Sequence, residues 1–143
     1  DPARPVFVES ESKKVGNLRV PEALIERMRA SACLRLEAAE ETRVALLMED
    51  YAHFVKNPEA LRGKLECLAA LHGAARIEAW TSQLRAGEWQ ALVSDLLRNH
   101  YDPAYQRSLL RNYKDAGTGK AVPVTDITPV GLRALARSII ALR

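Results

Sequence analysis

Two short apolar stretches near the start of the chain have the character of β-strands. Residues 5–8 form an apolar run that includes β-branched side chains and predicts a buried strand. Residues 33–36 alternate apolar and polar positions and predict a second strand. Between them, a polar loop over 9–17 leads to a helix over about 21–31, in which Pro21 suits the first turn.

Apolar positions recur at helical spacing from residue 40 to about residue 113. The breaks carry proline or glycine: one at Asn57, which suits a helix N-cap before Pro58, and two more at 72–73 and 86–87. This pattern predicts several helices joined by short connections in an antiparallel array. Trp80 and Trp89 lie on the apolar stripes, so we expect both in the core.

The last third of the chain predicts one more strand and one more helix. Residues 121–127 have the strand pattern, and Pro123 restricts that strand to a sheet edge or a strand end. Thr128 then caps a final helix. Strands separated by helices indicate an α/β fold with a partial parallel sheet, predominantly helical by residue count. We expect a single domain over 1–143 with a helical subregion at about 40–113, and three strands are few for a complete sheet, which suggests that part of the domain lies upstream.

Composition places the chain among ordinary globular proteins. Of its 143 residues, 48% are apolar and 27% are charged, and no apolar run approaches the roughly 20 residues of a membrane span. No signal peptide is visible, so we expect a soluble cytoplasmic protein without a membrane partner. Cys33 and Cys67 lie in apolar stretches and predict buried reduced thiols, without the spacing to histidines that a zinc site needs.

Charge is unevenly distributed along the chain. The net charge is +3, but residues 98–143 hold eight Lys or Arg against three Asp or Glu. A basic segment of this kind is compatible with a polyanionic partner such as nucleic acid. It is equally compatible with solvated helix faces.

Acidic and basic residues follow the predicted strand at 5–8. In open α/β sheets, ligands bind beyond the carboxyl ends of the strands, where Glu9 and Glu11 would lie. These two are the candidate catalytic acids, and Glu9 is also a candidate ligand for a metal ion. Lys13 and Lys14 are candidate phosphate-binding residues. The alternative is a solvated loop after a strand.

A second candidate site combines aromatic rings with arginines. Its members are Arg98, His100, Tyr101, Arg107 and Arg111. Rings interleaved with guanidinium groups can stack on bases and contact phosphates, as RNA-binding sites do. The alternative is a helix start in which Asp102 is the N-cap, Pro103 is in the first turn and the tyrosines pack in the core.

Two motifs give the chain a resemblance to a known family. Residues 5–17 read PVFVESESKKVGN and are followed by VPEAL at 20–24 and by Met28, and residues 100–105 read HYDPAY. In this order and at roughly this distance, the motifs resemble those of the tRNA 2-selenouridine synthase family. His100 stands where the family pattern leads us to expect tyrosine.

The resemblance, which spans about residues 5–113, implies a fold and a reaction. Family members join a rhodanese-like domain to a C-terminal P-loop domain, so the chain would be part of a P-loop NTPase-like domain with a large helical insertion. The family converts wobble 2-thiouridine in tRNA to 2-selenouridine: geranyl diphosphate first alkylates the sulfur, and selenium from selenophosphate then replaces it. The rhodanese-like cysteine and the glycine-rich phosphate loop are not in this sequence, so we expect the chain alone to be inactive and to hold no cofactor.

The resemblance also implies roles for the candidate residues. Glu9 would hold Mg²⁺ or a water, and Lys13 and Lys14 would contact the diphosphate or the tRNA backbone. The anticodon arm would be bound by Arg98, His100, Tyr101, Arg107 and Arg111. The expected partners are tRNA, the rhodanese-like and P-loop segments of the parent protein, and a second copy of the chain through an exposed sheet edge.

Two other functions remain open from the sequence. The chain could be a truncated P-loop ATPase or kinase domain, or a non-catalytic helical module that binds RNA or another protein. Salt-dependent tRNA binding would favour an RNA-handling role over a role that needs only a nucleotide.

Overall fold

The chain divides into two compact units in the computed structural model, which describes residues 5–10 and 13–142. Unit 1 consists of Asp1–Leu36 and Ala104–Val122, and unit 2 consists of Glu37–Pro103 and Pro123–Arg143. Helices predominate over small sheets, as the sequence predicts. The single domain expected over 1–143 stays a prediction.

A two-residue turn closes a β-hairpin in unit 1. Strand β1 (Lys14–Val15) pairs antiparallel with β2 (Leu18–Arg19). Gly16 has φ 58°, and no other residue of the turn has positive φ, which is the pattern of a type II′ hairpin turn with glycine at its first central position. The sequence predicted only a polar loop here.

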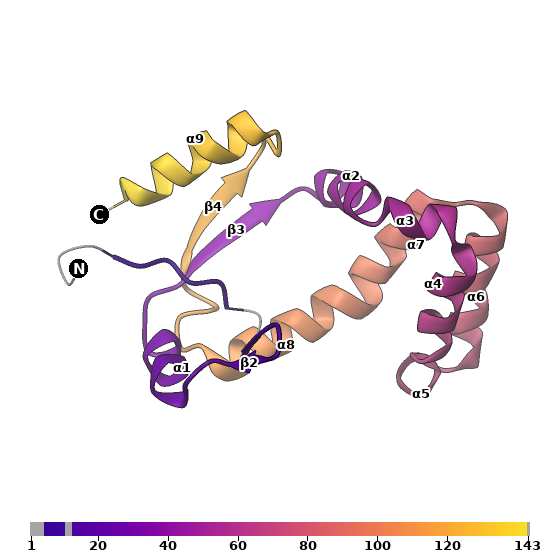
Figure 1. Ribbon diagram of the computed structural model, residues 1–143, viewed down its shortest axis with the longest axis horizontal. Helices are drawn as coiled ribbons and strands as arrows, with labels where there is room; N and C mark the ends of the chain where they lie inside the picture. The colour runs from indigo at the N-terminus through magenta and orange to yellow at the C-terminus, as the bar shows by residue number, and fades with distance from the viewer. Residues whose placement is uncertain (1–4, 11–12, 143) are drawn as a thin grey trace. The chain divides into compact units, whose positions relative to one another are not determined.

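Unit 1 also contains a helix and part of each strand of a parallel sheet. Helix α1 (Glu22–Arg29) forms where the sequence predicts a helix over about 21–31, and it buries Ile25. Strand β3 (Leu34–Ala38) and strand β4 (Lys120–Val124) form a two-stranded parallel sheet (Figure 1). Both strands were expected, although β4 begins one residue earlier and ends before 127.

The strand predicted over residues 5–8 is not formed. These residues have no regular structure, and their side chains are exposed, from 51% for Phe7 to 82% for Val6. An apolar run becomes a strand only where a neighbouring strand takes its backbone hydrogen bonds, and no described strand pairs with this one. The prediction of a buried strand was therefore wrong for this chain.

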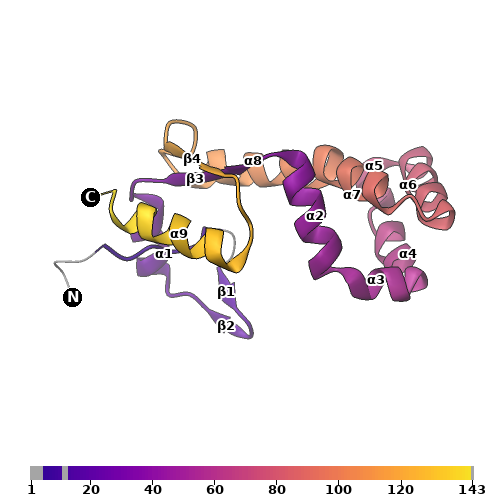
Figure 2. The same ribbon diagram turned by 90° about the horizontal axis from the view of Figure 1, so that it is seen from above.

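Short helices make up most of unit 2. They are α2 (Glu40–Asp50), α3 (Ala52–Lys56), α4 (Pro58–Glu66), α5 (Ala69–His72), α6 (Ala74–Ala86), α7 (Trp89–Leu96), the π-helical turn η1 (Leu97–Tyr101), the start of α8 (Asp102–Asn112) and α9 (Pro129–Ile140). The breaks lie where the sequence places them: Gly73 and Gly87 have φ of 79° and 71°, and the side chain of Asn57 accepts from the Ala60 N–H at 3.3 Å. Helix α4 packs against α6, and α6 against α7 (Figure 2).

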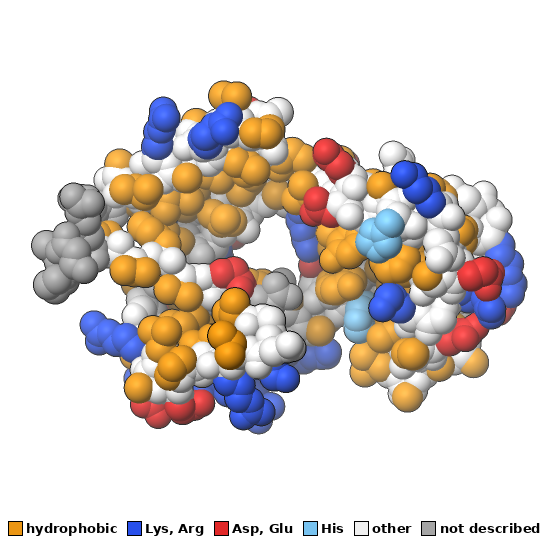
Figure 3. All heavy atoms as spheres, in the orientation of Figure 1, with side chains coloured by type: hydrophobic (Ala, Val, Ile, Leu, Met, Phe, Trp, Pro, Cys, Tyr) orange, Lys and Arg blue, Asp and Glu red, His pale blue; other side chains and the backbone are white. Residues whose placement is uncertain are grey.

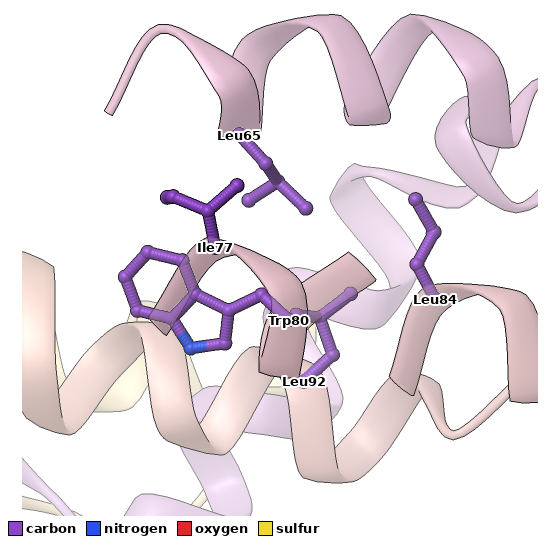
Figure 4. Close-up of a cluster of buried hydrophobic side chains, with 5 residues drawn as sticks. All are labelled: Leu65, Ile77, Trp80, Leu84 and Leu92. Atoms are coloured by element: carbon purple, nitrogen blue, oxygen red, sulfur yellow. The ribbon is translucent and has the colours of Figure 1, made fainter. Parts of the chain in front are cut away.

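The core of unit 2 forms around one tryptophan. Trp80 is fully buried and packs with four aliphatic side chains from α4, α6 and α7, namely Leu65, Ile77, Leu84 and Leu92 (Figure 4). Its indole N–H donates to an Asp95 carboxylate oxygen at 2.5 Å, which satisfies the polar atom that burial would otherwise leave unpaired. Trp89 packs against the same cluster. The expectation of a core position is confirmed for Trp80, whereas Trp89 lies against the core and stays partly exposed.

Other features of the described residues bear on the sequence predictions. Both cysteines are free thiols, but Cys67 is exposed and Cys33 is only partly buried, so the prediction of buried thiols was wrong for Cys67. Cys67 is exposed at the C-terminal end of α4, whereas Leu65, two residues before it, is buried in the core. No helix among the described residues is long and apolar enough to cross a membrane.

Candidate nucleic-acid interface

The acidic candidates do not form a sheet-edge site in the described residues. Glu9 is exposed in the irregular segment that replaces the predicted strand, and Glu11 lies outside the described residues. Throughout 5–10 and 13–142, no three His, Cys, Asp or Glu side chains are grouped so that they could hold a metal ion. The roles of Glu9 and Glu11, including that of Glu9 as a Mg²⁺ ligand, stay predictions.

The lysine candidates belong to the hairpin. Lys13 immediately precedes β1, and its carbonyl accepts from the Val20 N–H at 2.9 Å, which extends the pairing by one residue on each strand. Lys14 lies in β1 directly opposite Arg19 in β2. All three basic residues are exposed. The sequence singled out the two lysines but not Arg19, because only the strand register brings it beside Lys14.

The π-helical turn η1 carries three of the candidates for RNA contact. One of them, Arg98, donates from Nε to a Glu40 carboxylate oxygen at 2.7 Å. Ser94 donates to the other oxygen of Glu40. The hydrogen bond from Arg98, and then that from Ser94, lower the pKa of Glu40. Arg98 therefore joins η1 to the first turn of α2, while its side chain stays largely exposed.

His100 and Tyr101 differ in their surroundings. The Nδ1 atom of His100 lies 3.0 Å from Nε2 of His72, and the ring of His72 meets the edge of Trp80 with centroids 5.0 Å apart. Burial, and then the neighbouring His72, lower the pKa of His100. Tyr101 is 58% exposed. Of these two rings, Tyr101 is the more exposed, although it meets the ring of His100 with centroids 5.1 Å apart, and His100 belongs to the edge of the core.

Asp102 is an ion-pair partner and not a helix cap. Its backbone has helical angles, φ −62° and ψ −45°, because η1 runs directly into α8. Both carboxylate oxygens accept from the guanidinium of Arg43, at 2.9 and 2.5 Å, in a bidentate pair. Hydrogen bonding by Asp102 raises the pKa of Arg43. The capping explanation was wrong because an N-cap residue has non-helical backbone angles and a side chain that accepts from a backbone N–H, whereas Asp102 is helical and binds Arg43.

Arg107 and Arg111 lie on α8 and are exposed. Residues four apart lie on the same face of a helix, so the two guanidinium groups share one face. They belong to unit 1, whereas Arg98, His100 and Tyr101 belong to unit 2. The predicted site is thus two groups of residues, one in each unit, and RNA binding by each group stays a prediction.

Net charge differs between the two units. Unit 1 holds eleven Lys or Arg against six Asp or Glu, and unit 2 holds ten against twelve. Unit 1 is therefore basic and unit 2 slightly acidic. Figure 3 shows Lys and Arg side chains gathered near the place where Figure 1 draws β2. An anionic partner would be attracted to unit 1.

Comparison with known proteins identifies the family. A family model described as the tRNA 2-selenouridine synthase AAA domain matches residues 1–72. The chain belongs to the tRNA 2-selenouridine synthase family. The family resemblance seen in the sequence is thereby confirmed.

Three relatives are named tRNA 2-selenouridine synthase. Those of Cupriavidus pinatubonensis and Cupriavidus necator are 30% and 31% identical, and each match covers 71% of this chain and 35% of the relative. That of Marinobacter nauticus is 43% identical over 33% of this chain and 13% of the relative. The chain thus spans about a third of the length of the first two relatives. No solved structure matches it.

Proposed function

We propose that this chain is the tRNA- and diphosphate-handling part of an enzyme that converts wobble 2-thiouridine to 2-selenouridine. Family membership is the observation that carries the proposal, because the names of the relatives describe enzymes that act on tRNA. The concentration of basic residues in unit 1 supports it, since phosphate contacts dominate the affinity of proteins for nucleic acids.

The finer steps are part of the same proposal. The reaction takes place in the cytoplasm and passes through a geranylated intermediate, with geranyl diphosphate and selenophosphate as co-substrates. Lys13 and Lys14 of this chain contact the diphosphate or the tRNA backbone, and other segments of the parent enzyme complete the site. Within this chain, Arg107 and Arg111 contact the tRNA backbone, and Tyr101 stacks on an unpaired base. The exposure of the Tyr101 ring and the shared helix face of the two arginines support these roles.

Fluorescence anisotropy tests the proposal with the chain itself. A labelled tRNA with a wobble uridine and an unrelated RNA of equal length are titrated at several salt concentrations. We expect tighter binding to the tRNA, and we expect R107A/R111A to lower the slope of log affinity against log salt by about 1 for each arginine. The matched control K56A/K64A removes two exposed charges from unit 2 and leaves the slope unchanged.

The outcomes separate the candidate functions. Equal affinity for both RNAs would contradict a role in tRNA recognition and leave a non-specific RNA-binding module. If neither RNA binds while a nucleoside triphosphate does, a truncated ATPase or kinase domain replaces the proposal.

A further inference from the structure

Helix α1 ends in a half-buried arginine that is bound by a side chain distant in sequence. Arg29 lies in the last turn of α1, and its Nη2 atom donates to Oδ1 of Asn112 at 2.8 Å. Asn112 is the last residue of α8. This hydrogen bond joins the ends of the two helices within unit 1 (Figure 1).

Other half-buried arginines of the chain have carboxylate partners. Arg43 binds Asp102 through two hydrogen bonds, and Arg62 forms ion pairs with two glutamates of its own helix. In the described part of the chain, Arg29 has the neutral amide of Asn112 instead. An amide oxygen orients a guanidinium group without neutralising it, so the positive charge of Arg29 stays available to an anion.

Asn112 is itself held in the orientation that this contact needs. Its Nδ2 atom donates to the Ser108 carbonyl at 2.8 Å, one turn earlier in α8, so Oδ1 is the atom that accepts from Arg29. The Nε and Nη1 atoms of Arg29 have no acceptor among the described residues and are not buried, so they reach solvent. Adjacent N–H groups of a guanidinium match the oxygens of a phosphate in a bidentate contact.

Tyr113 brings this arginine close to the segment that carries Glu9. The Tyr113 hydroxyl donates to the Ser10 carbonyl at 3.1 Å, which ties residues 5–10 to the end of α8. Burial raises the pKa of Tyr113, while the charge of Arg29 opposes that rise and the charge of Glu9 adds to it. Arg29 and the candidate acid Glu9 therefore lie within electrostatic range of the same hydroxyl in unit 1.

We propose that Arg29 binds a phosphate group of the substrates and that Asn112 positions its guanidinium for this contact. The proposal rests on the proposed function for the source of the phosphate, which is the diphosphate or the tRNA backbone. It adds Arg29 to Lys13 and Lys14, and it places this third cation near Glu9. A planar guanidinium that is already oriented loses little conformational freedom when it binds.

Two titrations of the chain identify the source of the phosphate. Isothermal titration calorimetry measures the affinity for inorganic diphosphate, and fluorescence anisotropy measures both RNAs over a range of salt concentrations. If Arg29 binds the diphosphate, R29Q should weaken the binding of inorganic diphosphate by about 10- to 100-fold, as the loss of a charged hydrogen bond does. If Arg29 binds the RNA backbone, R29Q should lower the slope of log affinity against log salt by about 0.7 to 0.9 for both RNAs. No change in either titration overturns the proposal.

Two further variants separate binding from folding. Asn112→Asp keeps Arg29 but gives it a carboxylate partner, so it should reproduce the loss seen with R29Q while Tm stays near that of the parent. Arg27→Gln removes an exposed charge from the same turn of α1, and residues two apart do not share a helix face, so both titrations should stay unchanged. Parent-like binding by Asn112→Asp, or an equal loss in R27Q, overturns the proposal, because Arg29 would then act through the fold or through general charge.

The phosphate site and the proposed function fail in different ways. If the parent chain binds both RNAs equally and R29Q still causes a loss, tRNA recognition fails and the phosphate site stands. If the parent chain prefers the tRNA and R29Q has no effect in either titration, the function stands and the site fails. A parent chain that binds neither RNA nor inorganic diphosphate refutes both.

Discussion

Substitution of Asp102 tests whether this residue stabilises unit 2 as the ion-pair partner of Arg43 or as a helix cap. Asn caps a helix as well as Asp does, so Asp102→Asn would cost nothing if residue 102 were a cap. Asn cannot supply the charge that Arg43 binds through two hydrogen bonds. The substitution therefore separates the two explanations of the same residue.

The expected magnitude follows from exposure and geometry. The two side chains are 36% and 35% exposed, which makes solvent screening substantial, and exposed ion pairs contribute about 0.2–1 kcal/mol. The bidentate geometry places this pair toward the upper end, so we expect Asp102→Asn to cost about 0.5–1 kcal/mol in the parent chain. In an Arg43→Met background the same substitution should cost close to zero.

Urea unfolding followed by tryptophan fluorescence is a suitable assay, because both tryptophans lie in or against the core of unit 2. The parent chain, the two single variants and the double variant form a double-mutant cycle, which gives the coupling energy between residues 43 and 102. We expect 1 M salt to reduce this coupling energy. A neutral Asp102→Asn in the parent chain, or equal costs in the two backgrounds, would refute the ion pair and restore the cap.

Two further predictions concern the stability of unit 2. Leu92 is fully buried in the Trp80 cluster, so Leu92→Ala should lower the free energy of unfolding by about 2–5 kcal/mol in the same urea assay. The control Leu71→Ala changes a side chain that is 62% exposed and should stay within about 0.5 kcal/mol of the parent. Similar costs for the two variants would contradict the described core. Burial and His72 lower the pKa of His100 from its ordinary 6.5, so the contribution of neutral His100 is complete above about pH 6.5 and is lost as the pH falls through the lowered pKa. Thermal unfolding at pH 7.5 and pH 5 should show a larger drop in Tm for the parent than for His100→Tyr, and equal drops would exclude His100 as a source of the pH dependence.

Local features of the sequence were sufficient where the backbone alone decides the outcome. Gly73 and Gly87 have positive φ, a conformation that ends a helix and that glycine adopts more readily than other residues. The two glycines therefore mark helix ends in the sequence. The side chains of Asn57 and Thr128 accept from backbone N–H groups three residues on, so each cap needs only neighbours in sequence. The motifs at 5–17 and 100–105 sufficed to indicate the family.

Partners distant in sequence decided the rest. The run at 5–8 has strand character but no described strand pairs with it, and Asp102 looks like a cap until Arg43, 59 residues away, takes both of its oxygens. Arg19 joins the candidate site only through the register of the hairpin. A residue type fixes what a side chain can bind, but hydrogen bonds and ion pairs form only between groups a few ångströms apart, and tertiary structure alone sets those distances.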